Sequence, residues 1–135
     1  MQDPLALSGY DLSIDDVVAV SKGRTVAIHP DAIPRMVRSR NAVERLVAEG
    51  RIAYGITTGF GRFKDKLISP EQVAQPQLNL VRSHAAGTGA ELKEETVRAM
   101  LVTRANTLAM GYSGIRPEVV QLLVDMTNKG VHPCI

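Results

Sequence analysis

The sequence predicts a mainly α-helical fold with a minor short-strand element near the N-terminus. Long stretches place apolar residues at helical spacing, helix-start residues precede several of them, and glycines follow their ends. The stretch RTVAIHP, residues 24–30, is rich in β-branched residues and predicts one strand that ends at Pro30. Several of the expected helices are apolar across broad faces, which indicates a piece of a larger helical assembly.

The first half of the chain carries two helix signals. In DLSIDDVVAVSKG, a short extended piece precedes a helix that Ser13 would cap and Gly23 would follow. A second helix is expected from Asp31 to Glu49, with Asp31 as its N-cap. Pro34 then falls in the first turn, where the missing N–H of proline breaks no helical hydrogen bond.

The second half carries further helix signals. Ser69 and Pro70 begin a helix that Pro76 is expected to kink or break, so that a second helix runs from about Gln77 to Ala86. The stretch LKEETVRAMLVTRANTLAMG is the clearest helix in the chain. The last expected helix is RPEVVQLLVDMTNKG, and the residues expected to face inward there are Val119, Leu122, Leu123 and Met126.

Composition narrows the classes of partner. The 16 basic and 14 acidic residues are interspersed, and the arginines between Arg35 and Arg40 are typical of a solvated helix face, so no nucleic-acid partner is expected. The single cysteine, Cys134, excludes an internal disulfide and suits a reducing compartment. No apolar run approaches the ~20 residues that cross a bilayer, and the start MQDPLALSGYDL does not fit a signal peptide. We therefore expect a cytoplasmic chain without membrane contact.

The chain offers few signals for metal or phosphate chemistry. His29, His84 and His132 lie far apart, so no metal site is expected. The GFG and GTG triplets do not extend to a phosphate-binding fingerprint. Ser83 and His84 are neighbours whose side chains are expected to point in different directions on a helix, which does not favour a catalytic triad.

Tyr54 and His84 remain as candidate functional residues. Tyr54 lies in the glycine-rich stretch AYGITTGFGRF, where it is either a packing residue or a chemical group on a loop. His84 lies near the end of an expected helix, where a histidine often interacts favourably with the helix dipole. From the residues alone, a structural role is the favoured account of both.

Three stretches resemble the N-terminal region of the aromatic amino-acid ammonia-lyases. They are YGITTGFG from Tyr54, LVRSHAAGTG from Leu80, and the stretch from Ala105 to Ile135, and the resemblance extends from about Leu12 to Ile135. It implies the ammonia-lyase/fumarase-aspartase-like helical fold, a small-molecule amino-acid substrate and a homotetrameric enzyme. It also implies an electrophile, 4-methylidene-imidazol-5-one, that forms from an Ala-Ser-Gly triplet shortly after the stretch matching VHPCI.

The sequence contains no Ala-Ser-Gly triplet. The chain also stops on the apolar Ile135 soon after a helix-stop pattern, without a polar tail. We therefore expect residues 1–135 to be the N-terminal domain of such an enzyme, a fragment that ends before the triplet and is inactive alone. If these residues are the whole molecule, the alternative is a non-catalytic helical interaction module.

The resemblance implies roles for individual residues. Tyr54 matches the family's base for the substrate β-proton, and Gly61 matches a position that lines the site. An ordinary phenol is protonated at neutral pH, so a tyrosine base needs surroundings that favour the phenolate by roughly 4 kcal/mol. Thr57 stands where many members carry asparagine, and it keeps a hydrogen-bonding side chain.

The substrate is implied by a pair of adjacent residues. Ser83-His84 follows the pattern of the family members that act on histidine, and His84 would hydrogen-bond the substrate imidazole. The parent activity implied is the deamination of L-histidine to trans-urocanate and ammonia. A phenylalanine or tyrosine ammonia-lyase, or a related aminomutase, is the alternative that this pair excludes only imperfectly.

Overall fold

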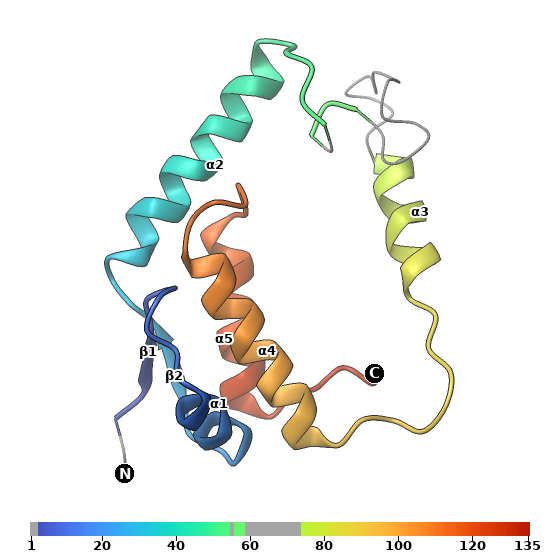
Figure 1. Ribbon diagram of the computed structural model, residues 1–135. Coiled ribbons are helices and arrows are strands. Elements are labelled where there is room, and N and C mark those ends of the chain that lie inside the picture. The colour runs from blue at the N-terminus through green and yellow to red at the C-terminus, as the bar shows by residue number, and fades with distance from the viewer. Residues whose placement is uncertain (1–2, 55, 59–73) are drawn as a thin grey trace. The chain divides into compact units, whose positions relative to one another are not determined.

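The computed structural model describes residues 3–54, 56–58 and 74–135 (Figure 1). In chain order the elements are β1 (Leu5–Leu7), α1 (Ile14–Ser21), β2 (Val26–Ile28), α2 (Ala32–Ala48), α3 (Ala74–His84), α4 (Glu94–Ala109) and α5 (Pro117–Lys129). The predicted mainly helical class is confirmed. The chain divides into a first unit, residues 1–41 and 90–135, and a second unit, residues 42–89.

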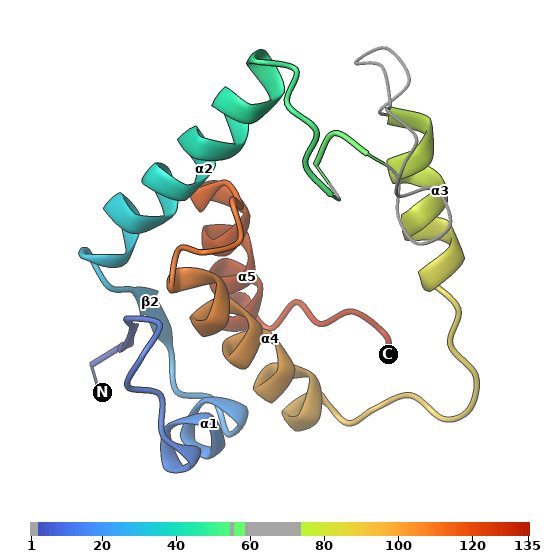
Figure 2. The ribbon, with the colours of Figure 1, turned by 45° about the horizontal axis from the view of Figure 1, so that its top comes forward.

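Two short strands form a parallel pair in the first unit. Leu5 of β1 pairs with Val26 of β2, and Leu7 pairs with Ile28. Parallel strands need a long connection, and here α1 provides it, as Figure 2 shows. The predicted strand in RTVAIHP is confirmed as β2, whereas β1 was not predicted.

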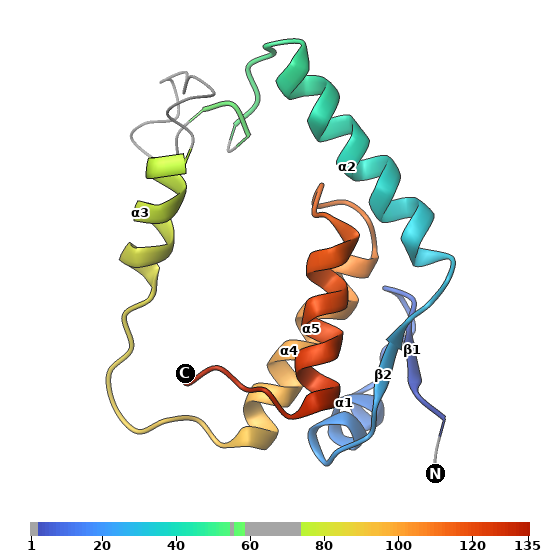
Figure 3. The ribbon, with the colours of Figure 1, turned by 180° about the vertical axis from the view of Figure 1, so that it is seen from behind.

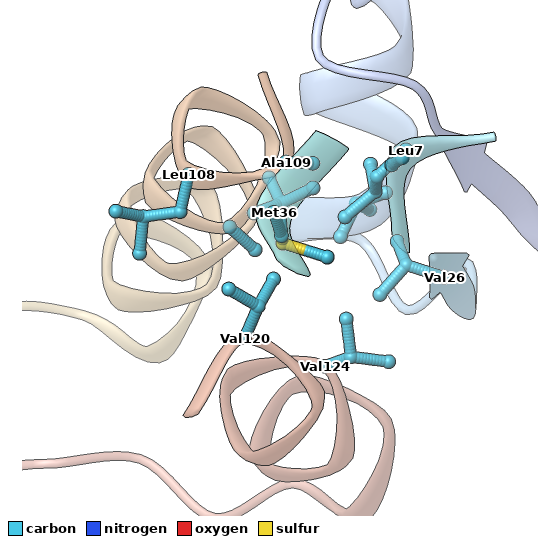
Figure 4. Packing of buried hydrophobic residues seen from close by; sticks show 11 residues of the cluster. Leu7, Val26, Met36, Leu108, Ala109, Val120 and Val124 are labelled. Carbon is cyan, nitrogen blue, oxygen red and sulfur yellow. The ribbon is translucent and has the colours of Figure 1, made fainter. Parts of the chain in front are cut away.

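The core of the first unit gathers buried residues from both strands and from α1, α2, α4 and α5. Figure 4 shows Met36 of α2 near the centre, among side chains from the strands and the two C-terminal helices. The buried cluster consists of Leu7, Val20, Val26, Ala32, Met36, Val102, Ala105, Leu108, Ala109, Val120 and Val124.

The buried face of α5 differs from the predicted one. Leu123 packs against the core as predicted. Leu122, predicted to face inward, is 57% exposed, whereas Val120, Val124 and Thr127 are buried. The reason is that α5 packs against both α4 and β2 (Figure 3), which shifts its buried face by one position. The hydroxyl of Thr127 is satisfied there because it donates a 2.8 Å hydrogen bond to the carbonyl of Leu123.

Helix α1 begins as predicted. Ser13 is its N-cap: the backbone N–H of Asp16 donates to the Ser13 hydroxyl at 3.1 Å, and that hydroxyl donates to the Asp16 carboxylate at 2.7 Å. The backbone N–H of Ser13 completes the capping box by donating to the same carboxylate oxygen at 3.3 Å. Arg24 adds an ion pair with Asp16 at 3.2 Å.

Helix α3, in the second unit, corrects the prediction for Pro76. The helix runs from Ala74 to His84, so Pro76 lies in its first turn and does not break it. A backbone N–H in that turn has no helical acceptor, so proline is tolerated there. The predicted start at Ser69 and Pro70 lies outside the described residues.

Polar side chains join separate elements of the first unit. The side chain of Asn128 pairs with both backbone groups of Val26: its oxygen accepts the N–H at 2.9 Å and its amide donates to the C=O at 2.8 Å. Buried Arg98 donates from Nε to the carbonyl of Val20 at 2.9 Å and from Nη1 to that of Thr127 at 2.6 Å. Both carbonyls lie in the last turns of their helices, where no helical N–H group is available to donate to them.

Candidate functional site

Tyr54 lies in a short turn of the second unit. The N–H groups of Ile56 and Thr57 donate to the carbonyl of Ala53 at 3.1 and 3.0 Å, which closes the turn around Tyr54. The tyrosine is 66% exposed. A packing tyrosine would be covered by neighbouring apolar groups, so its exposure in this unit does not support the packing interpretation.

Thr57 holds this turn together. Its hydroxyl donates to the carbonyl of Arg51 at 2.7 Å and accepts the N–H of Ala53 at 2.9 Å. A hydroxyl both donates and accepts, so one side chain ties the two arms of the turn. The interpretation that threonine is tolerated here because it keeps a hydrogen-bonding side chain therefore has a structural basis.

Ser83 and His84 lie in the last turn of α3, and both are exposed. The Ser83 hydroxyl donates to the carbonyl of Leu80 at 2.9 Å. The Nδ1 atom of His84 lies 2.9 Å from the same carbonyl oxygen and 3.1 Å from the Ser83 hydroxyl. The expectation that these two side chains point in different directions is therefore wrong, because both fold back onto one backbone oxygen.

This geometry assigns a tautomer to His84. A carbonyl oxygen only accepts hydrogen bonds, so Nδ1 must carry the hydrogen that faces Leu80. In the neutral ring Nε2 then has a free lone pair and acts as an acceptor. The Ser83 proton also faces the Leu80 carbonyl, so in this arrangement Ser83 does not donate to His84 as a nucleophile would to its base.

The described contacts bring together Ser83 and His84, and Tyr54 lies in a turn that backbone hydrogen bonds to Ala53 close. Gly61, the fourth predicted site residue, lies outside the described residues. Within the described ranges, no three metal-ligating side chains gather closely enough to hold an ion. No helix in the same ranges is both long and apolar enough to span a bilayer.

The sequence model of the family described as aromatic amino acid lyase matches residues 12–135. This chain belongs to the aromatic amino acid lyase family. It is 52% identical to a histidine ammonia-lyase of Gloeobacter violaceus over 100% of the chain, and 48% identical to one of Alkaliphilus metalliredigens over 97%. In both cases it spans 26% of the relative, about a quarter of its length.

Solved structures of family members have the same fold. The ergothioneine-degrading enzyme ergothionase of Treponema denticola superposes with a TM-score of 0.93 at 36% identity, covering 98% of this chain and 27% of that one. Tyrosine aminomutase of Streptomyces globisporus gives 0.92 at 34% identity, covering 98% and 26%. The fold expected for an ammonia-lyase N-terminal region is confirmed.

Proposed function

We propose that residues 1–135 are the N-terminal domain of a histidine ammonia-lyase, which eliminates ammonia from L-histidine to give trans-urocanate. The observation that carries this proposal is the Ser83-His84 pair, in which the histidine ring is held with Nε2 as an acceptor. The identity to histidine ammonia-lyases, 48–52% over nearly the whole chain, supports it. The resemblance also implies a homotetrameric, cytoplasmic parent enzyme.

His84 orients the substrate ring in this proposal. The Nε2 lone pair accepts the N–H of the substrate imidazole, so the substrate donates to the enzyme and not the reverse. Because Nδ1 is tied to Leu80, the ring of His84 keeps this tautomer while substrate binds. Phenylalanine has no ring N–H, so it would leave Nε2 unpaired, and a site built for a hydrogen bond discriminates strongly against such an analogue.

Tyr54 removes the β-proton of the substrate. Its phenolate oxygen takes the proton, the electrons of the Cβ–H bond form the Cα=Cβ double bond, and ammonia leaves with the electrons of the Cα–N bond. Tyr54 is exposed on its turn, which agrees with a side chain that meets a substrate. This role requires surroundings in the complete enzyme that stabilise the phenolate, and the two-thirds exposed side chain of Tyr54 leaves room for them.

The electrophile is not supplied by this chain, because the sequence holds no Ala-Ser-Gly triplet. When bound in the parent, 4-methylidene-imidazol-5-one would make the substrate amine a better leaving group. Residues 1–135 contribute Tyr54 as the base. They also contribute His84, which orients the substrate ring, and Ser83, which contacts His84. Gly61 is proposed to line the same site.

A substrate panel on the full-length parent tests the proposal. We expect histidine to be converted to urocanate with a specificity constant roughly a hundredfold or more above those of phenylalanine and tyrosine. Ammonia and urocanate are measured together, because an aminomutase retains the amine and releases little ammonia. Ergothioneine belongs in the panel because a structural neighbour degrades it. Preference for any other substrate, or a β-amino acid product, contradicts the proposal.

A further inference from the structure

The stretch that follows α5 is anchored at both of its ends. Gly130 caps the helix with a left-handed conformation (φ 67°), and the N–H of Val131 donates to the carbonyl of Met126 at 3.0 Å. The chain then returns toward the start of α4, where the N–H of Leu92 donates to the carbonyl of Ile135 at 2.8 Å. Residues 131–135 thus lie against the segment that begins α4.

His132 lies in the middle of this stretch. Its side chain is only 14% exposed, and its Nδ1 atom lies 3.7 Å from a carboxylate oxygen of Glu94, in the first turn of α4. That separation is an electrostatic contact and not a hydrogen bond. The Nε2 atom is buried and has no hydrogen-bond partner among the described residues.

A buried imidazole nitrogen without a partner is costly, and folded proteins usually provide one. An imidazole nitrogen donates or accepts a hydrogen bond according to the tautomer, so the Nε2 atom of His132 can be paired by a polar group of either kind. The missing partner is therefore a polar group. The two relatives are about four times as long as this chain, so they contain polypeptide that could supply it.

We propose that His132 is a positioning residue, which fixes residues 131–135 on the first turn of α4 through Glu94 and forms a hydrogen bond, at Nε2, with a polar group of polypeptide beyond residues 1–135. This inference rests on the proposed function, because the resemblance places the electrophile-forming triplet shortly after this stretch. The pair His132–Glu94 then sets the direction in which that segment approaches the substrate. A displaced segment would slow the chemical step without weakening substrate binding.

Asparagine and glutamine variants of the full-length parent separate the two nitrogens. In His132→Asn the side-chain amide reaches the position of the Nδ1 atom. In His132→Gln it reaches the position of the Nε2 atom. His132→Phe removes both nitrogen atoms. Glu94→Ala removes the partner, and Glu95→Ala is the matched control, because it deletes a carboxylate from the same helical turn. The measurements are kcat, KM and amide hydrogen exchange of residues 131–135.

In His132→Phe and Glu94→Ala we expect exchange of residues 131–135 to rise about tenfold. We expect kcat to fall ~10–10²-fold with KM within about twofold, because displacement of a reacting group by about 1 Å costs that much. His132→Asn should restore the protection against exchange that His132→Phe loses. Glu95→Ala should leave both measurements at the wild-type level.

Wild-type exchange in His132→Phe and Glu94→Ala overturns the proposal, as does an equal effect of Glu95→Ala. The exchange measurement does not depend on turnover. If the wild-type parent has no ammonia-lyase activity, the proposed function fails, while the exchange rates still decide whether His132 fixes this stretch.

Discussion

The Nη1 atom of Arg98, near the start of α4, donates a 2.6 Å hydrogen bond to the carbonyl oxygen of Thr127, near the end of α5. The same buried side chain donates from Nε to Val20 at the end of α1. One cation therefore satisfies backbone acceptors of two helices and is well placed at their negative ends. This contact makes the packing of α1, α4 and α5 mutually dependent.

Replacement of Arg98 should be among the most damaging changes in the first unit. Arg98→Met fills similar space but leaves the carbonyls of Val20 and Thr127 without donors, so we expect a loss of about 3 kcal/mol in the free energy of unfolding. Urea unfolding measures it. The control is Arg104→Met on the exposed face of the same helix, which should change stability by less than about 0.5 kcal/mol. Equal effects of both variants would show that the buried hydrogen bonds contribute nothing.

Gly111 should not tolerate a side chain. It has φ +82°, and a Cβ atom would lie 2.8 Å from the backbone carbon of Arg35. Gly23 is the matched control, because its φ is +112° but no atom lies within 4 Å of the added Cβ. We expect Gly23→Ala to cost about 1 kcal/mol from backbone strain and Gly111→Ala about 3 kcal/mol from strain and overlap, measured by thermal unfolding. A difference near zero would contradict the close approach.

The capping box of α1 makes stability depend on pH. Hydrogen bonds from Ser13, followed by the charge of Arg24, lower the pKa of the Asp16 carboxyl below its usual 3.8. A carboxyl whose pKa is lower in the folded state stabilises the fold above its unfolded pKa, and this stabilisation is lost as pH falls through the folded pKa. Asp16→Asn should therefore lower the unfolding midpoint at pH 7 and have progressively less effect below pH ~4.

Asp15→Asn is the control for that measurement. It removes a carboxylate from the same first turn, but Asp15 is exposed and lies outside the capping box. Its smaller effect should come from the helix dipole alone. A pH profile for Asp16→Asn that matches the profile for Asp15→Asn would exclude a special contribution from the capping box.

Tyr54→Phe in the full-length parent should lower kcat by ~10²–10⁴-fold, the range over which a positioned acid or base contributes. The phenyl ring keeps the shape of the exposed side chain but has no oxygen to take the β-proton. Because Tyr54 lies outside the buried core, the unfolding temperature should hardly change. Urocanate formation and thermal unfolding are measured on the same samples, and a near-normal rate removes Tyr54 from the role of base.

The isolated 135-residue chain should form no urocanate from histidine. It carries Tyr54 and His84 but no Ala-Ser-Gly triplet from which the electrophile could form. Incubation of the purified chain with histidine, followed by absorbance of the product, checks this. Turnover above a Tyr54→Phe control would show that the triplet is not required.

Local features of the fold could be predicted from the sequence, and features set by distant contacts could not. The cap at Ser13 was predictable because its partner, Asp16, is three residues away. Strand β1 was not, because its three residues acquire their conformation only by pairing with β2. The buried face of α5 also depends on neighbours, since contact with both α4 and β2 buries Val120 where periodicity favoured Leu122.

The site shows the same division. The family motifs indicated Tyr54, Ser83 and His84 as candidate site residues. They did not indicate which ring nitrogen of His84 carries the hydrogen. That assignment needed the position of the Leu80 carbonyl, which both side chains share. Burial of Arg98 was likewise unexpected, because an arginine in a helix normally indicates a solvated face, and its acceptors lie 78 and 29 residues away in the chain.

The first unit is assembled from two stretches of chain, residues 1–41 and 90–135, with residues 42–89 between them. On a translating ribosome, Leu7 and Met36 emerge well before Val120 and Val124, the α5 side chains that help to bury them. At about 5–20 residues per second, the apolar faces of β1 and α2 remain uncovered for several seconds. Nascent chains of this protein should therefore recruit holding chaperones during that interval and release them once α5 has left the exit tunnel.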